Sequence, residues 1–152
     1  MAGEWLQSLP GGGEGMAENM GGGQHARDRQ RVASGSPYEP IFGYCRAVRV
    51  GERVLIAGTA PIWPDGSCDP DTGVQAARCF EIIVTALQDL GGEPRHVVRT
   101  RMFITNAADA EAVGLAHGAV FAEARPVATM VVVAGLLDAR WNVEIEAEAI
   151  LD

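Results

Sequence analysis

The sequence predicts a single α+β domain in which two helices cover one face of a mixed β-sheet. Three observations lead to this fold class. Runs in which apolar and polar residues alternate, such as 143–151, are typical of half-buried strands. Runs with apolar residues three or four positions apart, such as 74–90, are typical of amphipathic helices. Turn-forming Gly, Pro and Asp residues separate these runs, and the predicted order is β-β-α-β-α-β-β.

The first predicted element is a β-hairpin. Residues 44–50 and 53–59 are rich in β-forming side chains, and only Gly51 and Glu52 separate them. Residues 61–73 contain Pro-Asp-Gly and Asp-Pro-Asp-Thr-Gly, so we expect a long turn-rich loop after the hairpin.

A helix over 74–90 and a strand over 97–105 follow the loop. Gly91 and Gly92 are suited to end the helix. Its apolar face consists of Ala76, Phe80, Ile83, Leu87 and Leu90. Alternation in the strand places Val98, Thr100, Met102 and Ile104 on one face and Arg99, Arg101 and Phe103 on the other.

A second helix and two strands complete the predicted domain. Asn106 or Asp109 can cap the helix, which extends to Ala124. Its apolar stripe consists of Val113, Ala116, His117, Val120 and Ala124. The last two strands are expected over 128–134 and 143–151. The helices leave one sheet face bare, and the chain has no further element to cover it, so oligomerisation is expected.

Residues 1–36 are expected to be a disordered tail, and residues 37–152 the folded domain. The first segment is rich in Gly, Gln, Glu and Arg, and it contains too few apolar residues to offset the entropy of ordering. A chain of 152 residues is sufficient for one hydrophobic core.

Composition excludes several classes of function. The formal net charge of −8 argues against nucleic-acid binding, which needs clustered Lys and Arg. No apolar run is long enough to cross a membrane, and the N-terminus does not resemble a secretion signal. The three cysteines show no disulfide or metal-site spacing, so we expect free thiols and a cytoplasmic location. The sequence contains no phosphate-binding loop or metal-ligand cluster, and no cofactor is expected.

Several segments, in order and at the right spacing, resemble the reactive intermediate deaminase (Rid) family, also called YjgF-like or L-PSP. The matching segments are Gly43-Tyr44, Ala47-Val48-Arg49-Val50, Leu55-Ile56-Ala57-Gly58-Thr59, Val97 to Met102 and Val143-Glu144-Ile145-Glu146-Ala147. The resemblance implies a chorismate-mutase-like fold and a homotrimer with small-molecule clefts between subunits. In this family, enzymes that hydrolyse imines carry an arginine two residues after a proline, where this chain has Ala128 after Pro126.

The chain is most similar to a branch of the family that lacks this arginine. The segments that carry the similarity are Ala116 to Phe121, Arg125 to Val133 and Leu136 to Ala139. Ala119 and Val132 replace two glutamates that are usual in the branch. A guanidinium fork suits a planar carboxylate, and Ala128 cannot provide it, so hydrolysis of 2-iminoacids such as 2-aminoacrylate is not expected.

Glu144 and His117 are the candidate catalytic residues. The resemblance places Glu144 where a glutamate orients the attacking water; the alternative is that it belongs to the polar face of its strand. In a partly apolar cleft its pKa would rise, and it could exchange a proton with an imine or enamine nitrogen. His117 could act as a general acid or base, or it could be a packing residue of the helix.

The candidate substrate-binding residues come mainly from the matched motifs. They are Tyr44, Gly58, Arg101, Ala128, Thr129 and Val132. Arg101 could replace the missing arginine if it faces the cleft; otherwise it is a solvated or interface residue. Trp63 and Trp141 lie in loops that could border the cleft, which favours a more apolar, aromatic ligand over a short amino-acid-derived acid.

Three functions remain open from the sequence. The first is an enzyme acting on an imine, an enamine or a similar reactive intermediate, in a tailoring step of a specialised pathway. The second is a trimer that binds a metabolite without converting it. The third is the endoribonuclease or translation-inhibitor role attached to the family by name, which the acidic composition disfavours.

Overall fold

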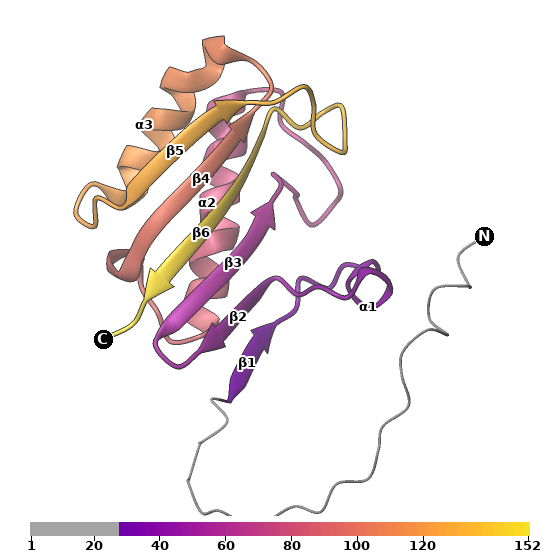
Figure 1. Ribbon diagram of the computed structural model, residues 1–152. Coiled ribbons are helices and arrows are strands. Elements are labelled where there is room, and N and C mark those ends of the chain that lie inside the picture. The colour runs from indigo at the N-terminus through magenta and orange to yellow at the C-terminus, as the bar shows by residue number, and fades with distance from the viewer. Residues whose placement is uncertain (1–27) are drawn as a thin grey trace, which may run out of the picture.

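A single six-stranded sheet forms the centre of the computed structural model, which describes residues 28–152. The strand order is β1-β2-β3-β6-β4-β5, and every neighbouring pair is antiparallel except β4 and β5. The strands are β1 (Arg29–Val32), β2 (Ala47–Val50), β3 (Arg53–Thr59), β4 (Val97–Ile104), β5 (Val127–Val132) and β6 (Val143–Ile150). Figure 1 shows the sheet with the long helices behind it. The predicted α+β class and mixed sheet are therefore confirmed.

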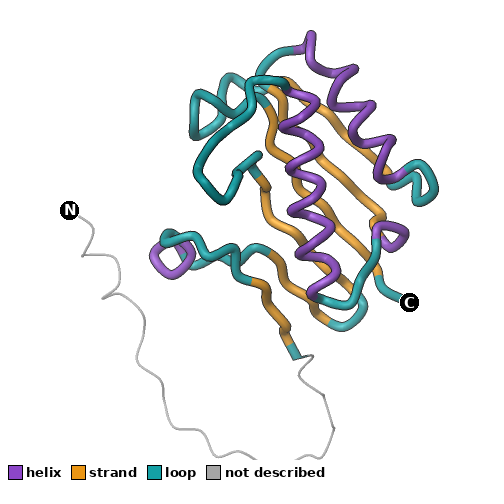
Figure 2. The backbone as a smooth tube through the Cα atoms, turned by 180° about the vertical axis from the view of Figure 1, so that it is seen from behind, coloured by secondary structure: helices purple, strands orange, loops and turns teal. Residues whose placement is uncertain are grey.

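The helices are one short and two long segments. They are α1 (Glu39–Phe42), α2 (Thr72–Asp89) and α3 (Ala110–Phe121), with single 3-10 turns η2 (Pro94–His96) and η3 (Ala107–Asp109). The Asp71 side chain caps α2 by accepting from the Val74 N–H at 2.9 Å, which satisfies one of the free donors at the start of the helix. Figure 2 shows α2 and α3 on the same face of the sheet, as expected.

Two elements near the N-terminus were not predicted. Arg29–Val32, within the segment expected to be a disordered tail, forms the edge strand β1 and pairs with β2. Because β1 is polar and only Val32 is half-buried, its order comes from backbone pairing, which composition does not reveal. The four-residue helix α1 lies where no helix was expected. Residues 1–27 of the expected tail lie outside the described residues.

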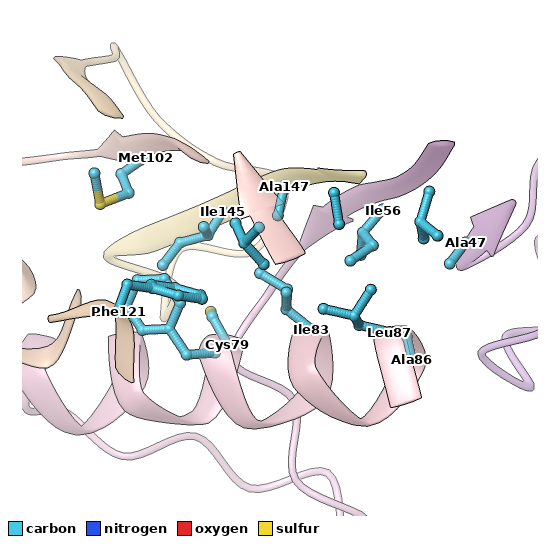
Figure 3. Close-up of a cluster of buried hydrophobic side chains, with 14 of the residues drawn as sticks. Ala47, Ile56, Cys79, Ile83, Ala86, Leu87, Met102, Phe121, Ile145 and Ala147 are labelled. Carbon is cyan, nitrogen blue, oxygen red and sulfur yellow. The ribbon is translucent and has the colours of Figure 1, made fainter. Parts of the chain in front are cut away.

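The core lies between the sheet and α2 (Figure 3). From α2, Cys79, Ile83 and Leu87 point toward the sheet, where Ile145 and Ala147 meet them. All five side chains are buried. The apolar face predicted for this helix is the observed one.

One residue of β4 departs from the predicted alternation. The register between β4 and β6 shifts between Val97 and Arg99, so Val97 is buried and Val98 is exposed. This β-bulge reverses the expected orientation of Val98, whereas Thr100, Met102 and Ile104 face the core as predicted. The sequence alternation did not show where the extra residue lies.

The sheet face opposite the helices carries a network of charged side chains. Arg53 pairs with Glu148 at 3.1 Å, and Arg101 pairs with Glu146 and approaches Glu148 at 3.9 Å. Leu55, on the same face, is 40% exposed. None of the described residues covers this face (Figure 1).

Candidate functional site

A pocket of about 1250 Å³ lies beside the second half of β3. β2 pairs with β3 as far as Ala47 and Ile56, and the chain before β2 then leads away toward α1 (Figure 1). This divergence opens a space between the α1 segment, the end of β3, one side of α2 and the loop before β6. Such a volume is ample for a small molecule.

Glu144 contributes a carboxylate to the pocket. It follows the buried Val143 in β6, so the alternation of the strand turns it away from the core and leaves it half-buried. Burial raises the pKa of Glu144, the positive charge of Arg46 opposes the rise, and the negative charge of Glu146 adds to it. A larger fraction of this carboxyl group therefore stays protonated near neutral pH than in an ordinary glutamate.

Gly58 provides the space that the Glu144 carboxylate occupies. A methyl group at Gly58 would overlap Oε1 of Glu144, so any side chain here would displace the carboxylate. Gly58 lies where the register between β3 and β6 shifts, between Ile56 and Thr59. The missing side chain of Gly58 thus makes room for the acid, and the binding role expected for Gly58 stays a prediction.

Arg46 is the pocket residue that sequence reasoning missed. Its Nη1 donates to the Gly58 carbonyl oxygen at 3.1 Å and to Thr59 Oγ1 at 2.8 Å, so the guanidinium is held at the end of β3. Its Nε is buried and has no acceptor among residues 28–152. The available signal was an arginine between Cys45 and Ala47, in a strand run of mostly apolar residues.

Aromatic side chains form much of the remaining wall. Trp63 and Trp141 both line the pocket, and the Arg78 guanidinium lies 5.9 Å from the ring centre of Trp63. Tyr38 and Phe42 of the α1 segment also line it, and their rings stack at 5.4 Å. The pocket therefore offers large apolar surfaces next to the charged groups of Glu144 and Arg46.

Tyr44 lines the pocket and was expected at the site. Its hydroxyl group donates to Ser36 Oγ at 3.1 Å, which links the two ends of the α1 segment. The side chain is 42% exposed. Its ring can contact a ligand while its hydroxyl group is bonded to the Ser36 side chain.

Gln75 fixes the loops that carry the two tryptophans. Its buried side chain donates to the carbonyl oxygens of Asp69 and Arg140, at 2.7 and 2.9 Å. Its Oε1 accepts from the Asn142 N–H at 2.7 Å. One α2 side chain thus joins the loop after β3 to the loop before β6.

The structure does not bring His117 to this pocket. His117 packs against Phe80 and Phe121, with ring centres 5.6 and 5.0 Å away, and its Nε2 lies 2.9 Å from Thr100 Oγ1. Thr100 is a core-facing residue, whereas Glu144 points away from the core. Burial lowers the pKa of His117, which favours the neutral ring. The packing role is the one that this geometry supports.

Arg101 also lies outside the pocket. Its guanidinium is engaged by Glu146 and Glu148 on the uncovered sheet face, beside a smaller cavity of about 290 Å³. This geometry fits the alternative reading of Arg101 as a solvated or interface residue.

Ala128, Thr129 and Val132 lie on β5, at the edge of the sheet. All three are exposed, and none lines the pocket that holds Glu144 within the described chain. β4 separates β5 from β6. A second copy of the chain would have to bring these positions to the pocket of the first.

Comparison with known proteins supports the resemblance in the sequence. The family model described as Endoribonuclease L-PSP matches residues 35–151, which include the whole pocket apart from its first residues. The chain belongs to this family, also called the Rid or YjgF family.

Individual Rid-family relatives agree with the match. The uncharacterized protein SCO2049 of Streptomyces coelicolor is 42% identical over 123 residues, which cover 79% of this chain and 90% of the relative. The structure of Rv2704 from Mycobacterium tuberculosis, a member of the YjgF/YER057c/UK114 family, is 37% identical with a TM-score of 0.75. The alignment covers 82% of this chain and all of that one. RidA from an Antarctic Psychrobacter species is 26% identical with a TM-score of 0.68, over 80% of this chain and 94% of its own.

The comparisons confirm the YjgF/L-PSP fold predicted for this Rid-family chain. Within residues 28–152, no group of three or more His, Cys, Asp or Glu side chains is arranged to hold a metal ion. In the same part of the chain, no helix is both long enough and apolar enough to cross a membrane.

Proposed function

We propose that this Rid-family protein acts on a reactive imine or enamine-type metabolite in the pocket around Glu144. The proposal is based on the half-buried carboxyl group of Glu144, which lines a pocket with aromatic walls. Burial raises the pKa of this group. A carboxyl group with these properties can give and take a proton near neutral pH. The wall residues favour an apolar, aromatic substrate.

In the proposed reaction, the Glu144 carboxyl group gives its proton to the nitrogen of the C=N bond. Water adds to the imine carbon, and the carboxylate takes a proton from that water. The resulting carbinolamine breaks its C–N bond, which releases ammonia and leaves a carbonyl compound. An enamine is first protonated on carbon by the same group and becomes the imine.

Hydrolysis of short 2-iminoacids is not part of the proposal. Family enzymes with that activity hold the substrate carboxylate with an arginine at the position of Ala128, and a methyl group cannot form such a contact. The exposed Val132 also makes this end of β5 apolar.

We further propose that the working site lies between subunits of a homotrimer. Two features support this assembly: the uncovered sheet face and the exposed edge strand β5, which carries Ala128, Thr129 and Val132. An exposed edge and an uncovered face are both surfaces that proteins usually bury. In the trimer, β5 of one subunit would complete the pocket of its neighbour.

Replacing Glu144 with Gln tests the proposal. Aromatic imines, generated in place from amino acids by an oxidase, are supplied to the protein, and release of ammonia above the uncatalysed rate is measured. We expect Glu144→Gln to reduce this rate by about a hundredfold or more while ligand binding is retained. Glu111→Gln, an exposed position on α3, is the matched control and should keep full activity.

Two results would contradict the proposed reaction. Equal rates for Glu144→Gln and the wild type would remove Glu144 from the mechanism. Binding of aromatic ligands without turnover of any imine by the wild type would favour the second function, a trimer that holds a metabolite without converting it.

A further inference from the structure

Arg46 lines the pocket, and one edge of its guanidinium group is unpaired among residues 28–152. Nη1 is engaged by the Gly58 carbonyl oxygen and Thr59 Oγ1. Nε is buried without an acceptor among residues 28–152, and no hydrogen bond of Nη2 occurs within the same residues. The Nε–Nη2 edge is one that can form a two-point contact with a carboxylate.

The two contacts of Nη1 hold the Nε–Nη2 edge of Arg46 in a fixed orientation. They fix the guanidinium against the end of β3, so little side-chain freedom remains to be lost on binding. A buried guanidinium nitrogen without an acceptor is unfavourable, and an acceptor supplied by a ligand would remove that cost. The geometry therefore favours an acceptor with two oxygen atoms.

Of the other charged residues that line the pocket, Arg78 and Asp138 have partners, whereas Asp89 forms no ion pair or side-chain hydrogen bond with a described residue. Arg78 donates to the Ile62 carbonyl oxygen at 2.9 Å and to Glu81 at 2.7 Å. Asp138 pairs with Arg140 at 2.7 Å. Glu144 forms no ion pair with any described residue.

The walls of the pocket indicate what the rest of the ligand is. Trp63, Trp141, Tyr38 and Phe42 present aromatic rings to a volume of about 1250 Å³. Flat apolar surfaces of this kind favour an aromatic body, and a two- or three-carbon acid would leave most of them in contact with water.

We propose that Arg46 recognises the carboxylate of an aromatic acid, whose apolar part packs against the tryptophans and whose reacting carbon lies toward Glu144. This inference rests on the proposed function and names its substrate class. It assigns carboxylate recognition to the residue before β2 in place of the β5 position occupied by Ala128.

Binding of a matched pair of probes tests the assignment. The acid 3-phenylpropionate and its amide, 3-phenylpropionamide, differ in charge but hardly in size, and neither is an imine. We expect the wild type to bind the acid at least about tenfold more tightly than the amide in NMR titrations at neutral pH. Arg46→Gln should abolish this preference by weakening only the acid, whereas Arg46→Lys should retain part of it, because lysine keeps the charge but not the fork.

Arg95→Gln is the control for net charge. Arg95 is exposed on η2 and pairs with Glu93 away from the pocket, so its loss should leave the preference unchanged. Arg46 also holds the end of β3, so its substitution removes structural contacts as well as the proposed ligand contact. A second measurement therefore uses the wild type. Its Arg46 Nε–H resonance should move on addition of the acid and stay in place with the amide.

Several outcomes would overturn the inference: an undiminished preference for the acid in folded Arg46→Gln, no preference in the wild type, or no binding of either probe. These outcomes differ from failure of the proposed function. Acid binding through Arg46 without imine turnover would leave the inference standing and contradict the function. Turnover that depends on Glu144 but not on Arg46 would support the proposed function and contradict the role of Arg46.

Discussion

At the scale of single residues, the site depends on a pairing between Gly58 and Glu144. Glu144 is held in a half-buried position because Gly58 has no side chain to exclude it. The same position makes its charged form costly, since burial raises its pKa. A glycine on β3 thus makes room for a half-buried acid on the neighbouring strand β6.

Gly58→Ala should therefore displace the Glu144 carboxylate while leaving the fold of the domain intact. The added methyl group overlaps the end of a flexible side chain, so we expect the carboxylate to move toward solvent. Its pKa should then fall toward the ordinary value of a glutamate, as measured by carbon NMR of the carboxyl group.

Gly114→Ala on α3 is the matched control for this substitution. A methyl group there meets no atom within 4 Å. It should leave the pKa of Glu144 unchanged and stabilise the helix by roughly 0.5–1 kcal/mol. An unaltered Glu144 pKa in Gly58→Ala would contradict the role assigned to Gly58.

The sequence predicted part of this residue-level arrangement. Tyr44, Gly58 and Glu144, taken from the family motifs, all line one pocket. His117 and Arg101 could not be placed from the pattern, because a helical stripe does not show whether a histidine packs in the core or faces a ligand. Arg46 was missed because its role depends on where β2 leaves β3, a feature of the tertiary structure.

At the scale of elements, Gln75 joins two loops that the sequence separates by more than sixty residues. Its hydrogen bonds reach Asp69 on one loop and Arg140 and Asn142 on the other. The walls that carry Trp63 and Trp141 thus depend on a single buried side chain of α2.

Gln75→Leu should destabilise the protein and loosen both loops. The substitution keeps the volume but removes the side-chain amide's hydrogen bonds to two carbonyl groups and one N–H, which should cost about 2 kcal/mol or more. Urea unfolding measures the loss, and faster hydrogen exchange of the Asn142 amide reports the loosened loop.

Gln88→Leu provides the comparison, since Gln88 is exposed on the same helix. It should change the free energy of unfolding by no more than about 0.5 kcal/mol. Equal losses in the two variants would show that Gln75 does not join the loops as described.

The elements themselves were largely predictable because their patterns are local. The apolar stripe of α2 and the alternation in β6 follow from the burial of one face. β1 was not predictable, because its order comes from pairing with β2 and its residues carry no apolar alternation. The bulge at Val98 was missed for a related reason, since the position of an extra residue depends on the partner strand.

At the scale of the whole molecule, the uncovered sheet face and the exposed strand β5 are the features that a second copy could bury. The proposed trimer would cover the first and bring the second to the pocket. We expect sedimentation equilibrium at micromolar concentration to give three times the mass of one chain.

Leu55→Arg should shift this equilibrium toward the monomer. Leu55 is 40% exposed on the uncovered face, and a charge there would have to be buried on association. Leu115→Arg, on the outer surface of α3, where Leu115 is 70% exposed, should leave the assembly intact. A monomeric wild type would contradict the inter-subunit site.

If Glu144 carries the proton in imine conversion, as proposed, turnover should depend on pH through this carboxyl group. The wild-type rate of ammonia release, corrected for uncatalysed hydrolysis, should fall as pH rises through the raised pKa of Glu144, because the acid form is then lost. Glu144→Gln should be slow at every pH and lack this decline. A decline of the same size and midpoint in both proteins would contradict proton transfer by Glu144.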